Sequence, residues 1–392
     1  MDGNIERHFD HMEKFLKYYW QWYGYPDTFK GRLITIFNIF RIFLLMVLVG
    51  IAASQAYFYG MSYLVDGSAI FLPLGIMSLV LNSHQSWNFG SIVKTAKQFE
   101  LFLSSFQDEE ERNLIASRMK ERKRTVLQIV LIIEFYLMAP LMCHAISMTL
   151  HYYGFLKKPV LIPLLFEMFL EGNYELGPKL IATAVVSVFY VHLVANIVTM
   201  ILLNVHFLGL VVACLEVLTE RLKGFAEKTQ EGYGKLKEEL DLRDTIQQHA
   251  DLLHIINSFN SWNGFLVTFC LAACSITFCL DALTTKRALE QEIYSGACLW
   301  GSFLLVMMVL SYLICDSGSQ IETKSEELLR AVYNLPWYRG SSETRKAVWM
   351  MLTQGNRLII LNYKELMDLN MVTYLEMLKR AYSYFMILSS IE

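Results

Sequence analysis

Long apolar blocks separated by polar connections run along the whole chain. The blocks lie at about 33–57, 67–90, 125–150, 180–215, 253–284, 294–316 and 370–390. A helix needs about 20 apolar residues to cross the roughly 30 Å hydrocarbon core of a membrane, and each block meets or approaches this length. The pattern predicts an all-α, polytopic membrane protein with seven transmembrane helices.

The fourth block is too long for a membrane span. Its 36 residues, 180–215, would form a helix of about 54 Å, so one end must project into water and the fifth helix should return from the same side. Apolar residues recur at helical spacing beyond the block, at Leu218, Leu222 and Phe225. Such stripes predict helices that bury one face against one another outside the membrane.

These patterns divide the chain into four regions. Residues 1–32, rich in aromatic and basic side chains, are expected to form a helix in the inner headgroup layer. Residues 33–318 form six transmembrane helices with cytoplasmic extensions. Residues 319–369 form a cytoplasmic anchor, and residues 370–392 form the terminal helix.

Lysine and arginine gather in alternate connections. The segment before the first block and the connections after the second, fourth and sixth blocks carry 26 of them, whereas the other three connections carry five. Because positive loops stay in the cytoplasm during insertion, the N-terminus is predicted to be cytoplasmic. An odd number of spans then puts the C-terminus outside the cell.

Composition narrows the possible chemistry. Apolar residues make up 54% of the chain and charged residues 18%, with no basic stripe of the kind that binds nucleic acid. No metalloprotease, phosphate-loop or nucleophile-elbow motif occurs, so neither an enzyme nor a cofactor is expected. Seven cysteines fall within or beside the apolar blocks. Cys279 and Cys298 flank one outer connection and could form a disulfide, but packing as buried thiols is favoured.

The last sixty residues carry a family resemblance. Asn334-Leu-Pro-Trp-Tyr338, Arg345-Lys346, Leu352-Thr-Gln-Gly-Asn-Arg357 and Ala381-Tyr-Ser-Tyr-Phe385 resemble the C-terminal signature of insect odorant receptors. The shared co-receptor of that family is longer, chiefly in its four–five inner connection, which is short here. The resemblance is therefore to a ligand-tuning subunit.

The resemblance implies an odorant-gated, non-selective cation channel that assembles with the co-receptor, as a tetramer, in the plasma membrane of olfactory dendrites. Its partners would be the co-receptor, a small volatile odorant and the lipid bilayer. The terminal helix would line the pore, with Ile387 and Ile391 at the gate and Ser383 or Tyr384 further inward. Arg380 would mark the inner mouth or snorkel towards the interface. A homomeric gustatory-type channel and a metabotropic seven-helix receptor remain the alternatives.

The resemblance also implies an odorant pocket in the outer half of the membrane, between helices two, three, four and six. His144 is a polar group there that needs a partner. Apolar and aromatic side chains with a few polar groups suit small volatile ligands. The candidate lining residues are Phe71, Leu74, Gly75, Tyr136, Pro140, Cys143, His144, Val186, Phe189, Tyr190, Trp300 and Phe303.

Overall fold

The computed structural model describes residues 71–106, 108–121, 176–230, 235–292, 294–339, 341–355 and 366–391, with single residues between 36 and 57 and between 124 and 153. Its elements are helices. They are α4 (Phe71–Ser104), α6 (Leu176–Gln230), α7 (Lys235–Glu290), α8 (Tyr294–Tyr333), the short 3₁₀ helix η3 (Trp337–Arg339), α9 (Ser342–Gly355) and α10 (Met371–Ile391).

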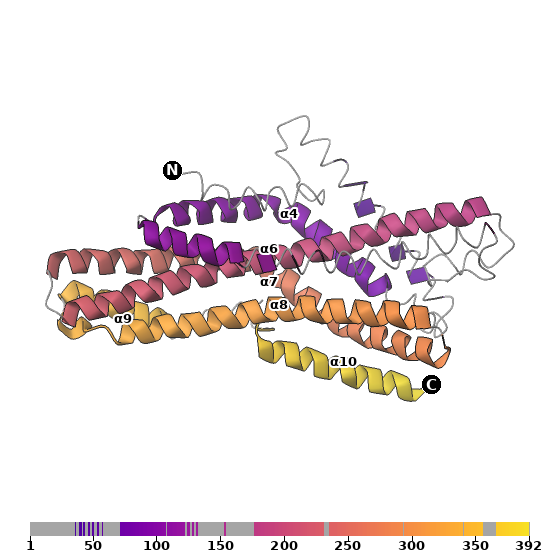
Figure 1. The fold of residues 1–392 in the computed structure, drawn as a ribbon. Helices are drawn as coiled ribbons and strands as arrows, with labels where there is room; N and C mark the ends of the chain where they lie inside the picture. Colours follow the sequence, from indigo (N-terminus) through magenta and orange to yellow (C-terminus); the bar gives the residue numbers. More distant parts are fainter. Residues whose placement is uncertain are drawn as a thin grey trace.

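The helices form one elongated bundle (Figure 1). α6 and α7 contain 55 and 56 residues, which corresponds to about 83 Å each. α8 packs against both of them, α4 packs against α6 and α7, and α10 packs against α7 and α8. The end of α6 and the start of α7 lie at the same end of the bundle as α9, and α10 lies towards the other end (Figure 1).

The long helices confirm that the fourth apolar block extends far beyond a membrane span. The start of α8 agrees with the predicted block 294–316, but the helix continues to Tyr333. It therefore runs unbroken through residue 318, where a boundary between membrane region and anchor was expected, and that division stays a prediction. Apolar blocks mark only the part of a helix that faces lipid, because the water-facing continuation is amphipathic.

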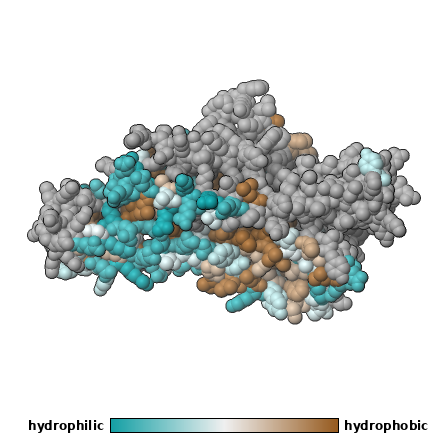
Figure 2. Space-filling view, in the orientation of Figure 1, coloured by the Kyte–Doolittle hydropathy of each residue, from teal (hydrophilic) through white to brown (hydrophobic). Residues whose placement is uncertain are grey.

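Polar and apolar surfaces separate along the bundle. Figure 2 shows hydrophilic side chains gathered at the end that carries α9 and hydrophobic ones over the region of α8 and α10. Three described stretches are long and apolar enough to cross a membrane: Asn196–Glu227, Leu242–Glu290 and Trp300–Tyr333. The first predicted block, 33–57, is helical wherever it is described, and most of the third, 125–150, lies outside the described residues, as do residues 1–32.

Local signals set where the last helices begin and end. Tyr333 ends α8 shortly before Pro336, since proline disfavours helical geometry in the residue before it. Ser341 Oγ accepts a hydrogen bond from the backbone N–H of Thr344 at 3.1 Å and so caps α9. Asn370 Oδ1 accepts one from the N–H of Thr373 at 3.0 Å and caps α10. Both contacts satisfy N–H groups that a helix start leaves unpaired.

Aromatic rings pack together near the middle of α6 and α7. The rings of Phe207 on α6 and Phe259 on α7 stack with their centroids 3.8 Å apart. Phe99 on α4 lies 5.2 Å from Phe207, and Trp262 meets Phe259 edge-on at 5.1 Å. Trp262 also donates a hydrogen bond to Thr95 Oγ1 at 3.3 Å. Rings from three helices thus share one core, and the polar edge of the tryptophan is satisfied within it.

Candidate ligand-binding and gating site

Ends of four helices come together at one end of the bundle. The start of α6, the end of α7, the start of α8 and the end of α10 all lie there (Figure 1). Lys286 near the end of α7 donates a hydrogen bond to Ser389 Oγ on α10 at 2.6 Å. This contact ties the end of the terminal helix to the bundle.

Four of the twelve predicted pocket residues have described side chains. Trp300 and Phe303 on α8 are 5% and 4% exposed, and Leu74 on α4 is 1% exposed. Gly75 faces the first predicted span, because a Cβ built on it would lie 2.9 Å from Val49 Cγ2. The close approach of two helices is enough to explain a glycine at this position, and no ligand is needed to account for it.

The other eight predicted residues stay predictions. Tyr136, Pro140, Cys143 and His144 lie outside the described residues, and the side chains of Phe71 on α4 and of Val186, Phe189 and Tyr190 on α6 are also outside them. Of the two flanking cysteines, Cys279 is a buried free thiol and Cys298 an exposed one. The disulfide between Cys279 and Cys298 is therefore not formed. The buried thiol of Cys279 agrees with the alternative that these cysteines pack within the helices.

A close contact joins α8 to the segment that leads into α10. A Cβ built on Gly318 would collide with the carbonyl oxygen of Leu369. In the next position Ser319 Oγ accepts a hydrogen bond from the backbone N–H of Met371, the first residue of α10, at 2.8 Å. Thr373 Oγ1 donates to the carbonyl of Asp368 at 2.6 Å. The start of α10 is therefore held to α8 by backbone contacts that leave little room for adjustment.

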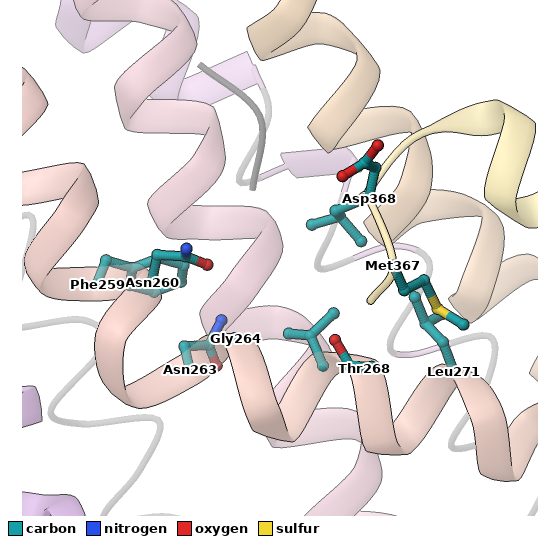
Figure 3. A pocket seen from close by; sticks show the side chains of 10 residues that line it. Phe259, Asn260, Asn263, Gly264, Thr268, Leu271, Met367 and Asp368 are labelled. Atoms are coloured by element: carbon teal, nitrogen blue, oxygen red, sulfur yellow. The ribbon is translucent and has the colours of Figure 1, made fainter. Parts of the chain in front are cut away.

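A small cavity lies beside this junction, between α7 and the segment before α10 (Figure 3). Its volume of about 10 Å³ is room for about one water and not for an odorant. Asn263 and Thr268 line it from α7, and Met367 and Asp368 line it from the other side. Asn263 donates a hydrogen bond to Asn204 Oδ1 on α6. The cavity is a small gap of mixed polar and apolar lining beside the start of α10.

α10 packs with only one face. Met377 and Ala381 are 2% and 6% exposed, and Tyr374 donates from its hydroxyl to the carbonyl of Met308 on α8 at 3.4 Å. The predicted pore residues Ser383, Tyr384 and Ile387 are exposed. Ser383 and Ile387 lie on other sides of the helix, whereas Tyr384, seven residues after Met377, is exposed on the same side nearer the end of the helix. The side chain of Ile391 lies outside the description. Arg380 pairs with Glu376 at 3.0 Å along the helix, so its charge is locally compensated.

Two features of this region were not predicted from the sequence. Gly318 and Ser319 contact residues about fifty positions away, and no local pattern signals such a contact. Asp281 carried a visible signal, because it is the one acidic residue in the block 253–284. An ionisable side chain inside an apolar block is a functional candidate in its own right.

Comparison with known proteins identifies the family. The family model described as 7tm Odorant receptor matches residues 69–382, well over half of the chain. The chain belongs to the odorant receptor family. This confirms the resemblance found in the C-terminal residues and the prediction of an all-α, seven-helix membrane protein.

Individual relatives are distant. Putative odorant receptor 85d and odorant receptor 67a, both of Drosophila melanogaster, are 23% and 22% identical to the chain over 171 residues. The match covers 43% of this chain and 40% and 41% of those receptors, so it spans about two fifths of each relative. The solved structure of the insect olfactory receptor OR5 from Machilis hrabei in complex with eugenol covers 99% of both chains, with a TM-score of 0.71 and 9% identity. At that identity the likeness concerns the fold.

Proposed function

We propose that this odorant receptor is the odorant-binding subunit of a ligand-gated, non-selective cation channel that assembles with a shared co-receptor. One observation carries the proposal: α10 packs against α7 and α8 with a single face and leaves Tyr384 and Ile387 about half exposed. A terminal helix whose second face has no cover in one chain suits the lining of a pore between subunits.

The proposed gate rests on the chemistry of that exposed face. Branched apolar side chains arranged around a narrow passage exclude water and so block ions until the helices move apart. Ile387 is 56% exposed and lies on the side of α10 away from Met377 and Ala381. The junction at Gly318 and Leu369 would transmit movements of α8 to the start of α10. At this junction α8 directly contacts the segment that leads into α10.

The odorant would bind between the outer ends of the helices. The family and the fold support detection of a volatile, and OR5 from Machilis hrabei was solved with the small aromatic compound eugenol. Buried Trp300 and Phe303 are the described residues that best fit the wall of such a pocket. In this arrangement the receptor lies in the plasma membrane of a sensory neuron.

Voltage-clamp recording in oocytes tests the proposal. Expression with the co-receptor should give odorant-evoked cation currents, and expression alone should give none. Ile387→Trp should abolish or strongly reduce the current of the pair while surface expression stays normal. Full conductance of Ile387→Trp would contradict the gate, and currents from this chain alone would favour a homomeric channel.

A further inference from the structure

Asp281, in the last turns of α7, is a fully buried acidic residue with 0% exposure. Both of its carboxyl oxygens are out of contact with solvent, and neither has a hydrogen-bond partner among the described residues. Taking an ionised carboxylate out of water without a partner costs many kcal/mol, so proteins pair such groups or hold them neutral. A side chain of this kind indicates a partner that the described part of the chain does not supply.

Neighbouring donors on α7 are engaged elsewhere. Thr277, Thr284 and Thr285 each donate their hydroxyl to the backbone carbonyl four residues earlier, at 3.0, 2.8 and 2.7 Å. Lys286 donates to Ser389 and lies 3.6 Å from Glu290. Arg287 is six residues further on, and at about 100° per residue it points to another side of the helix. The helix therefore provides no internal counter-charge for Asp281.

The register of α7 against α8 puts Asp281 on the side of α7 that is turned towards α8. Cys274, seven residues before Asp281, lies beside Ser311 on α8. Thr285, four residues after Asp281, meets Gly301, since a Cβ on that glycine would lie 3.7 Å from Thr285 Cγ2. Positions spaced by four and seven share one helix face, and the two contacts fix the antiparallel register. In this register Asp281 lies level with residues 303–305 and about one turn from Trp300.

Two of the predicted pocket residues therefore lie on the stretch of α8 opposite Asp281. Trp300 and Phe303 are both buried there. Aromatic faces attract cations, and a carboxylate forms charge-assisted hydrogen bonds with them. An unpaired carboxyl group at the same level of the bundle as buried aromatic residues suits a small organic cation.

We propose that Asp281 binds the nitrogen of a basic odorant, so that the ligand class of this receptor is volatile amines. The inference rests on the proposed function and narrows its ligand. The amine would supply the hydrogen-bond donors that Asp281 lacks, and its apolar part would lie against the aromatic residues of α8. The binding energy would come from pairing a group that is already desolvated in the empty receptor.

Matched ligand pairs test this assignment in oocytes that also express the co-receptor. Benzylamine and phenethylamine are compared with benzyl alcohol and phenethyl alcohol, which have nearly the same shape but no basic nitrogen. The amines should activate the wild type at lower concentrations. Asp281→Asn should raise the half-maximal concentration of the amines at least about tenfold, as expected when one partner of a buried charge pair is removed. Glu292→Gln, an exposed acidic residue at the same end of α7, is the control and should leave both series unchanged.

Each other outcome has a defined meaning. Activation by the alcohols alone, or an equal effect of Asp281→Asn on both series, would overturn the amine assignment and leave the channel proposal intact. Absence of current with every volatile, in cells that express both subunits at the surface, would contradict the proposed function and this inference with it.

Thermal unfolding of the purified receptor in detergent gives a second readout. Without ligand, Asp281→Asn should raise the melting temperature, because an unpaired buried carboxyl group is removed. Benzylamine should stabilise the wild type and not the variant. A lower melting temperature of the variant without ligand would mean that Asp281 has a structural partner. The site would be assigned to an inorganic cation if sodium chloride stabilised the wild type more than choline chloride did, and Asp281→Asn removed this difference. Either result would overturn the proposal.

Discussion

A single glycine determines how closely α8 approaches the segment before α10. Gly318 leaves no space for a Cβ, because that atom would meet the backbone carbonyl of Leu369. Gly318→Ala must push backbone against backbone, and overpacking of this kind costs about 1 to 3 kcal/mol. We expect a lower melting temperature in detergent and a weaker odorant-evoked current, since the start of α10 is displaced.

Gly301→Ala on the same helix is the matched control. A Cβ there would meet Thr285 Cγ2 at 3.7 Å, an ordinary contact. Replacing glycine by alanine inside a helix gains about 0.5 to 1 kcal/mol when space permits. The two substitutions should therefore change the melting temperature in opposite directions. Equal changes would show that the close contact at Gly318 does not restrict the packing of α8.

A second residue-scale prediction concerns Arg221 on α6. Its guanidinium donates to both carboxylate oxygens of Glu111, with Nε to Oε1 at 2.7 Å, and to Gln248 on α7 at 2.8 Å. Arg221 and Glu111 are 23% and 16% exposed. Arg221→Met leaves Glu111 half-buried and unpaired, so unfolding should become easier by about 1 to 3 kcal/mol.

Lys223→Met supplies the comparison for Arg221. The Lys223–Glu220 pair, at 2.7 Å, is more than half exposed on both sides, and exposed pairs contribute about 0 to 1 kcal/mol. Melting temperatures of the two variants in the same detergent decide the matter. If both variants have the same melting temperature, the Arg221 contacts behave as a surface ion pair and do not stabilise the packing of the helices.

At the scale of the element, α10 carries both buried and exposed side chains. Met377 and Ala381 are buried against the bundle, whereas Tyr384 and Ile387 are exposed. Cysteines introduced at Tyr384 and Ile387 should react with charged methanethiosulfonate reagents and change the current, while cysteines at Met377 and Ala381 should not. The exposed Cys298 should first be changed to serine. Equal reaction at all four positions would mean that α10 does not pack as a single-faced helix.

The sequence predicted the helices better than their contacts. Apolar blocks are a local signal, so the starts of α8 and α10 agree with the predicted blocks 294–316 and 370–390. The full lengths of α6 and α7 were not predictable from apolar density, since the parts of these helices beyond the apolar blocks are amphipathic. The sequence also does not show which helix faces contact one another. No local pattern predicts the contact of Gly75 with Val49 or that of Ser319 with Met371.

At the scale of the whole molecule, the charge distribution and the fold lead to one orientation in the membrane. Connections rich in lysine and arginine include those that join α6 to α7 and α8 to α10. Figure 1 places the end of α6 and the start of α7 at the same end as α9. This end is also the hydrophilic one in Figure 2. Since positive connections stay in the cytoplasm, the end with α9 should be cytoplasmic and the end of α10 extracellular.

Epitope tags on intact cells test this orientation. A tag after Glu392 should bind antibody without permeabilisation, and a tag before Met1 or between Glu231 and Gly234, in the α6–α7 connection, should bind only after it. The opposite result, with the C-terminus inside, would favour a metabotropic seven-helix receptor. It would also turn the Asp281 end of α7 towards the cytoplasm, where a volatile from outside would have to cross the membrane to reach it. The tag at Glu392 therefore bears on the channel and on the amine site together.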